Sequence, residues 1–214
     1  MGRYDGIIFD IDGTLTSTNE LIFASFNHIT KKYLDKSLTN EEVVSLFGPT
    51  EDKIIEDWFG ENAEKVKRDY YSFYNDNHAM ASLYSGMKEL LQFLKEKNIL
   101  LSIYTGKGRK AALLTLKKLE IYDFFDLIIT GSDVKDHKPS PEGIEIFLDK
   151  YSLEKERVLM VGDAPADIKA ARAAGVQVAS AVWDSYAREE VLEMESNFVF
   201  HTVEEMKTFF EKEF

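Results

Sequence analysis

The sequence predicts an α/β protein with a doubly wound, Rossmann-like parallel sheet and an all-helical cap domain inserted after the first strand. Two observations predict the sheet. Short apolar runs alternate along the chain with amphipathic helical segments, and the runs are apolar on both faces, as in parallel strands that helices cover on both sides. A third observation predicts the cap, because one long stretch near the N-terminus shows helical patterns and no strand.

Six apolar runs predict the strands of the core, and most of them end at a polar or glycine-containing turn. They cover residues 7–9, 99–104, 127–130, 158–161, 176–179 and 198–200. The segments between them carry helical stripes, such as Met87, Leu90, Leu91 and Leu94 at spacings of three and four residues. Each strand–helix–strand unit is expected to cross over with a right hand.

The inserted stretch runs from about residue 18 to residue 82. Ile22, Phe26 and Ile29 share one helical face, and later segments repeat such stripes. The stretch has 7 basic and 12 acidic residues, so it is no clamp for a polyanion.

We therefore divide the chain into an α/β core domain, residues 1–16 and 84–214, and a helical cap domain, residues 17–83. The two crossings between them, near residues 14–17 and 81–86, are hinge candidates.

Composition limits the partners. With 38 acidic and 26 basic residues the formal net charge is −12, which repels nucleic acid and anionic membranes. The chain has no cysteine, which excludes disulfides and thiolate chemistry and fits a cytoplasmic location. The N-terminus does not have the pattern of a signal peptide, and no apolar run approaches the roughly 20 residues of a membrane helix. The sequence does not indicate an oligomeric state.

Polar residues gather at the ends of the predicted strands. They are Asp10, Asp12, Thr105, Asp133, Lys138, Asp163 and Asp167. The carboxyl ends of parallel strands form the ligand crevice of an open sheet. We therefore expect these side chains to converge.

The first motif is Asp10-Ile11-Asp12-Gly13. Two carboxylates that face one crevice repel each other unless a cation or a shared proton intervenes. Oxygen ligands of this kind favour Mg²⁺, which needs only one or two protein carboxylates. An acidic loop without a metal is the alternative.

The second motif is Gly162-Asp163-Ala164-Pro165-Ala166-Asp167. Its two acids can supply a metal ligand and a supporting partner. The alternative is that Asp163 caps the helix that begins near Pro165. Paired with the first motif, the metal interpretation is favoured.

Two further motifs predict a phosphate site. Thr105-Gly106 offers a hydroxyl and backbone N–H groups at an expected helix N-terminus. Lys138 lies in a loop with two prolines and can neutralise both a phosphate and a carboxylate. We interpret Lys107 as a solvated charge outside the site.

These four motifs, in this order, resemble the haloacid dehalogenase superfamily, specifically its phosphoglycolate-phosphatase-like branch with a helical cap. The resemblance covers essentially the whole chain. It implies a Mg²⁺-dependent phosphatase in which Asp10 attacks phosphorus and forms an aspartyl-phosphate. Asp12 then protonates the leaving oxygen and activates the hydrolytic water.

The same resemblance implies the binding roles. Mg²⁺ is held by Asp10, the backbone carbonyl of Asp12, and Asp163, with Asp167 in support. Thr105, Gly106 and Lys138 bind the phosphoryl oxygens. The expected partner is a small phosphorylated metabolite, and phosphoglycolate, pyrophosphate, sugar phosphates and nucleoside monophosphates all stay open.

Rival activities share the fold. A phosphonoacetaldehyde-type C–P hydrolase needs an imine-forming cap lysine, for which Lys53 is the candidate, although acids surround it. Hexose-phosphate mutases of the superfamily usually carry an apolar residue at the position of Thr14, and dehalogenases lack the acid at position 12. A phosphoacceptor receiver domain is a further, non-enzymatic alternative, but it has no helical insert. Gly48-Pro49-Thr50 is either a turn that reaches the cleft or a plain helix connection.

Overall fold

The computed structural model describes residues 2–214. Its strands are β1 (Gly6–Phe9), β2 (Thr16–Ser17), β3 (Ser82–Leu83), β4 (Leu100–Tyr104), β5 (Leu127–Ile129), β6 (Val158–Gly162), β7 (Gln177–Ala181) and β8 (Phe198–Phe200). Its α-helices are α1 (Asn19–Leu34), α2 (Asn40–Val44), α3 (Glu51–Phe59), α4 (Ala63–Asp76), α5 (Met87–Glu96), α6 (Arg109–Lys118), α7 (Glu142–Tyr151), α8 (Pro165–Ala174), α9 (Arg188–Glu193) and α10 (Val203–Glu213).

Six of the strands form one parallel sheet in the order β5-β4-β1-β6-β7-β8. All six runs predicted as strands are therefore strands, and the predicted fold class is confirmed. β1 lies at the centre, between β4 and β6. The chain leaves β1 toward one side of the sheet and later returns to its other side, and a ligand crevice forms where a parallel sheet reverses direction in this way.

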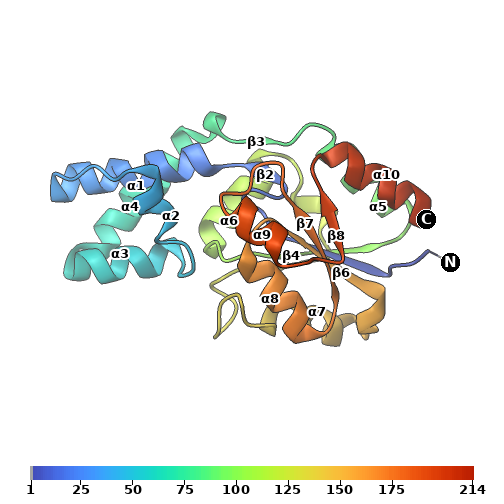
Figure 1. Ribbon diagram of the computed structural model, residues 1–214. Coiled ribbons are helices and arrows are strands. Elements are labelled where there is room, and N and C mark those ends of the chain that lie inside the picture. The colour runs from blue at the N-terminus through green and yellow to red at the C-terminus, as the bar shows by residue number, and fades with distance from the viewer. Residues whose placement is uncertain (1) are drawn as a thin grey trace.

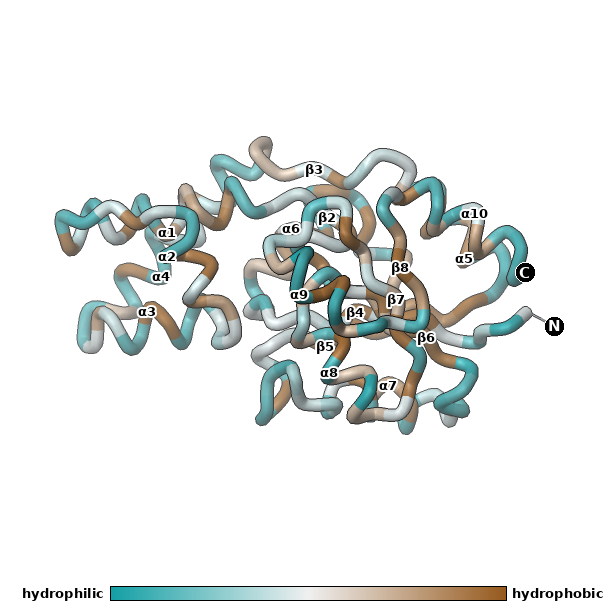
Figure 2. The backbone as a smooth tube through the Cα atoms, viewed as in Figure 1, coloured by the Kyte–Doolittle hydropathy of each residue, from teal (hydrophilic) through white to brown (hydrophobic). Residues whose placement is uncertain are grey.

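The two faces of the sheet bury separate hydrophobic clusters. Because side chains alternate along a strand, Ile7 and Phe9 of β1 face the helices α5, α6 and α10, and Ile8 faces α7, α8 and α9. All three side chains are fully buried. Figure 2 shows the hydrophobic colour concentrated on the strands, with hydrophilic segments at the outer turns. Helices on both sides explain why these strands are apolar on both faces.

Helices α1 to α4 lie together at one end of the molecule, away from the two chain termini (Figure 1). They bury a hydrophobic cluster of their own, in which Phe26 of α1 packs on Tyr70 of α4 with ring centroids 5.2 Å apart. Ala111 of α6 also belongs to this cluster and links it to the sheet domain. We propose the division into a core, residues 1–16 and 84–214, and a cap, residues 17–83.

The two crossings between core and cap pair with each other. β2 and β3 form a short antiparallel ribbon in which Thr16 lies opposite Leu83 and Ser17 opposite Ser82. The sequence did not predict this ribbon, which has only two residues per strand, too few for a periodic pattern. It lies within both hinge candidates, so cap movement would bend a paired ribbon instead of two independent linkers.

Among residues 2–214, no helix has the length and apolarity that crossing a membrane requires. The cytoplasmic location stays a prediction.

Candidate active site

The loop after β1 brings the first motif to the centre of the crevice. The backbone N–H of Asp10 donates to Val161 O at 2.9 Å, which extends the pairing with β6. Gly13 has a φ of +77°, and an added Cβ would lie 2.4 Å from Asp163 Oδ2. A side chain at this position is therefore excluded twice, by the left-handed backbone and by the approach of the second motif.

Three carboxylates meet beside this loop. Asp10, Asp163 and Asp167 are all buried, and each offers an oxygen within 4.8 Å of the other two. Thr14 Oγ1 donates to Asp163 Oδ1 at 3.1 Å. Both oxygens of Asp167 are occupied, because Oδ2 accepts from the backbone N–H of Ala164 at 3.0 Å and Oδ1 accepts from a lysine. Asp167 thus braces the cluster.

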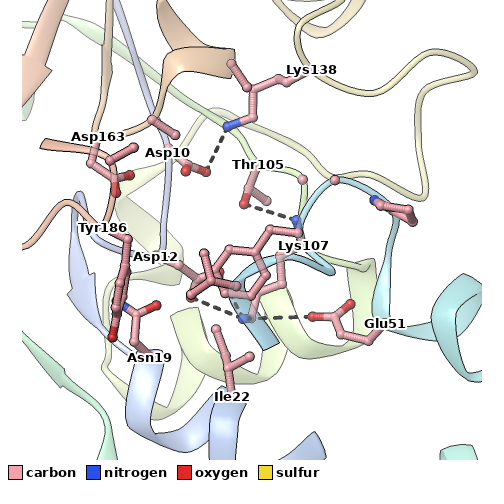
Figure 3. A pocket seen from close by; sticks show the side chains of 18 of the residues that line it. Asp10, Asp12, Asn19, Ile22, Glu51, Thr105, Lys107, Lys138, Asp163 and Tyr186 are labelled. Atoms are coloured by element: carbon pink, nitrogen blue, oxygen red, sulfur yellow. Dashed lines mark hydrogen bonds and ion pairs between the residues drawn. The ribbon is translucent and has the colours of Figure 1, made fainter. Parts of the chain in front are cut away.

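That lysine is Lys138, from the loop between β5 and α7. Its Nζ lies 2.6 Å from Asp167 Oδ1. The same Nζ lies 3.1 Å from Asp10 Oδ1 (Figure 3). The contact with Asp10 is an ion pair without hydrogen-bond geometry. Asp10 Oδ1 is buried and accepts no hydrogen bond from any side chain or backbone group in residues 2–214. The charge of Lys138 therefore holds this oxygen of Asp10 in place.

Burial shapes the electrostatics of these acids. It raises the pKa of Asp10 to about 6, against the opposing charge of Lys138 and with the charges of Asp167 and Asp12 adding to the rise. Burial and the charge of Asp10 raise the pKa of Asp163 well above its usual range. Three acids with one ammonium group leave an excess of negative charge, which a bound cation would relieve.

Asp12 points away from this cluster and pairs with Lys107. The Lys107 Nζ lies 3.0 Å and 3.1 Å from the two Asp12 carboxylate oxygens, and its side chain is only 2% exposed. The hydroxyl of Thr18 also donates to Asp12. The interpretation of Lys107 as a solvated charge is wrong. A loop lysine gives no sequence signal of burial, because its partners lie far away in the chain.

Lys107 also reaches the cap. Its Nζ lies 3.8 Å from Glu51 Oε1, and Glu51 Oε2 accepts the backbone N–H of Gly108 at 2.7 Å. Glu51 is buried in the first turn of α3. Sequence reasoning treated Glu51 only as one of the acids around Lys53 and missed this contact.

Thr105 and Gly106 follow β4 on the same side of the crevice. Thr105 is buried, and its Oγ1 accepts the backbone N–H of Lys107 at 3.3 Å. Helix α6 begins only at Arg109, with Gly108 at its N-cap position. The expected helix N-terminus at Thr105 is therefore wrong by about one turn. The loop still presents the Thr105 hydroxyl beside the acidic cluster (Figure 3).

Core and cap enclose a cavity of about 280 Å³ above these residues. Six of the seven predicted site residues line it, namely Asp10, Asp12, Thr105, Gly106, Lys138 and Asp163. Asp167 lies behind Asp10 and Lys138. Gly48 and Pro49 also line the cavity, so the turn that they form reaches the cleft and is more than a helix connection.

Two other candidates from the sequence, Asp133 and Lys53, lie outside the site. Asp133 accepts from the backbone N–H and hydroxyl of Thr130 and pairs with Arg109 at 2.8 Å, outside the cavity. Lys53 is exposed and pairs with Asp57 at 2.6 Å. Asp163 does not cap α8, whose N-cap residue is Ala164.

A comparison with protein families matches residues 7–181 to haloacid dehalogenase-like hydrolases. The chain belongs to this family. It is an enzyme of the hydrolase class, and the sequence resemblance is confirmed.

Relatives extend over nearly the whole chain. The pyrophosphatase PpaX of Anoxybacillus flavithermus is 34% identical over 201 residues, which are 94% of this chain and 94% of that protein. The pyrophosphatase PpaX of Bacillus velezensis is 35% identical over 185 residues, 85% of this chain and 84% of that one.

Solved structures share the fold of both domains. A predicted phosphoglycolate phosphatase from Haemophilus somnus superposes with a TM-score of 0.87 at 23% identity, covering 98% of this chain and 99% of that one. The structure of CbbY from Rhodobacter sphaeroides in complex with phosphate gives a TM-score of 0.80 at 20% identity, over 93% and 94% of the two chains. At these identities the likeness shows the fold alone.

Proposed function

We propose that this protein is a Mg²⁺-dependent phosphatase that uses Asp10 as a covalent nucleophile on a small phosphorylated metabolite. The observation that carries the proposal is the state of the Asp10 carboxylate. It lines the cavity, lies 3.1 Å from the buried ammonium of Lys138, and offers an oxygen within 4.8 Å of oxygens of Asp163 and Asp167. A carboxylate that faces a cavity beside a lysine and a candidate metal cluster is placed to accept a phosphoryl group.

The donor set fits a magnesium ion. Asp10 and Asp163 supply buried carboxylate oxygens within reach of each other. Burial, and after it the charge of neighbouring carboxylates, raises the pKa of both groups, and a divalent cation would stabilise their anions. We assign the metal to Asp10, Asp163 and the backbone carbonyl of Asp12, with Asp167 bracing the site. When bound, the ion supplies electrostatic stabilisation to the phosphoryl group and keeps Asp10 in its anionic form.

Lys138 and Thr105 would bind the phosphoryl group. Lys138 Nζ is buried beside Asp10, so a phosphoryl group approaching Asp10 enters the field of this ammonium. Thr105 and Gly106 also line the cavity. Phosphoryl transfer depends chiefly on positioning and charge neutralisation, which this arrangement provides.

Asp12 would serve as general acid and base. It lies two residues from the nucleophile, and Lys107 and Thr18 hold its carboxylate. In the first step it gives a proton to the leaving oxygen, and in the second it takes a proton from the water that attacks the aspartyl-phosphate. The cap encloses the cavity and keeps other water away from the intermediate.

The names of the relatives make pyrophosphate one of the substrates to test, beside phosphoglycolate, sugar phosphates and nucleoside monophosphates. The carbon–phosphorus hydrolase alternative loses its candidate lysine. Lys53 is exposed, and its hydrogen bond with Asp57 raises its pKa, so it stays an ammonium that cannot form an imine.

The test is a screen of phosphorylated metabolites with wild type and Asp10→Asn, with Mg²⁺ and with EDTA. We expect wild-type phosphate release that EDTA abolishes and Mg²⁺ restores. Ca²⁺ should restore it poorly, because its larger and looser coordination misplaces the nucleophile. Asp10→Asn should lose several orders of magnitude in turnover, as other nucleophile deletions do. Full turnover without metal, or by Asp10→Asn, would contradict the proposal.

A further inference from the structure

The cavity has two unlike ends, and the difference bears on the substrate if the proposed phosphatase function holds. Its floor carries the carboxylates and Lys138. Its cap side is formed mostly by apolar side chains, namely Ile22, Phe26, Val44, Phe47 and Ile54. A phosphoryl group held at Asp10 would direct the rest of the substrate toward this apolar wall.

Among the described residues that line the cavity, the cations are Lys107 and Lys138. Lys138 is held by the acids on the floor, where it faces the reacting phosphoryl group. Lys107 is therefore the cation left for any second anionic group of a substrate.

Lys107 is already neutralised. Its Nζ lies between Asp12, at 3.0 Å, and Glu51 of the cap, at 3.8 Å. Burial alone would lower the pKa of Lys107, but Asp12, Tyr74 and Glu51 together outweigh it and raise this pKa above its ordinary value. Burial raises the pKa of Glu51, whereas the charge of Lys107 and the N–H of Gly108 favour its anion. One ammonium thus serves two carboxylates.

We propose that Glu51 is a specificity-determining residue that quenches Lys107, so that the cavity accepts phosphate monoesters with an uncharged, mainly apolar organic group and rejects a second anionic group. A second phosphate or a carboxylate would have to lose its water beside an apolar wall and a carboxylate, without a free cation. Pyrophosphate and phosphoglycolate both carry such a second anion.

The experiment compares two substrates that differ by one charge. Phenyl phosphate and 4-carboxyphenyl phosphate release phenols of similar acidity, so the ratio of their kcat/KM values reports the cost of the carboxylate. We expect wild type to favour phenyl phosphate by about tenfold or more, on the scale of one unit charge at short range in a partly desolvated site. Glu51→Gln keeps the side-chain shape and an oxygen for the Gly108 N–H, and it should reduce this preference about tenfold.

Glu56→Gln is the matched control. Glu56 lies on the same helix and is half exposed, and it pairs with Lys67 away from the cavity. This variant should keep the wild-type ratio. A change as large as that of Glu51→Gln would mean that the general charge of the cap, and not Glu51, sets the preference, and would overturn the proposal.

The substrate preference of the wild-type protein is a second test of the inference. Equal or better hydrolysis of 4-carboxyphenyl phosphate, pyrophosphate or phosphoglycolate than of phenyl phosphate would overturn the inference and leave the phosphatase function standing. Failure to release phosphate from any of these and from the metabolite screen would count against the proposed function itself.

Discussion

Replacing Asp10 with Asn should stabilise the metal-free protein while it abolishes turnover. The pKa of Asp10 is raised from 3.8 to about 6, mainly by burial. A native state with the higher pKa binds the proton more tightly than the unfolded chain, so the stability associated with this group is fully present below about pH 4. That stability is lost as the pH rises through about 6. A rise of about 2 in the pKa of Asp10 corresponds to a free energy of unfolding that is lower by about 3 kcal/mol at pH 7.5.

Urea unfolding in EDTA measures this difference. At pH 7.5 Asp10→Asn should exceed wild type by about 3 kcal/mol in the free energy of unfolding. As the pH falls below about 4 the difference should shrink toward zero, because wild-type Asp10 then becomes protonated in the unfolded chain as well as in the folded state. Mg²⁺ should stabilise wild type and narrow the gap, since a ligand that binds only the folded state raises its stability.

A variant that is less stable than wild type in EDTA at pH 7.5 would refute this reasoning. So would a stability gain that does not change between pH 4 and pH 7.5, because the gain would then come from packing and not from charge. Asp123→Asn, the same chemical change at an exposed residue outside the cavity, serves as the control for nonspecific effects of substitution.

Three other substitutions test separate parts of the site. Gly13→Ala should lower the free energy of unfolding by about 1–2 kcal/mol, because alanine is strained in the left-handed backbone, and it should reduce activity by displacing Asp163. A free energy of unfolding equal to that of wild type, measured in urea, would contradict the effect on stability. Lys107→Met should lower kcat more than it raises KM, because Asp12 loses the group that holds it, and steady-state kinetics showing an unchanged kcat would disprove the positioning role. Lys53→Ala should keep phosphate-ester hydrolysis within about tenfold of wild type. Treatment of the wild-type protein with borohydride and phosphonoacetaldehyde should leave it active, and inactivation that maps to Lys53 would instead indicate a C–P hydrolase.

The sheet was predictable because its strands carry their own signal. Each of the six runs is apolar over several residues, and burial on both faces gives such runs whatever the partners are. The same logic placed Asp10, Thr105 and Asp163 together, since the ends of adjacent parallel strands meet at one edge. Local pattern and general topology were enough for these residues.

The roles of Lys107 and Glu51 were not predictable in this way. Both are charged residues in or beside loops, where solvation is the usual state. Their burial arises only when the cap docks on the core and brings positions 51 and 107 within 3.8 Å. The β2–β3 ribbon was not predicted for a related reason. Its two strands are far apart in sequence, and each has too few residues to show a strand pattern.

The covalent nucleophile is the central claim, and trapping the phosphorylated enzyme tests it most directly. Asp12→Ala removes the base that activates water, so its aspartyl-phosphate should persist when the protein is mixed with a hydrolysable substrate and Mg²⁺. Acid quenching, peptide mapping and mass spectrometry should then find one phosphoryl group, on Asp10, and none in the double variant Asp10→Asn/Asp12→Ala. A phosphoryl group on any other residue, or one that is still found in the double variant, would contradict the mechanism.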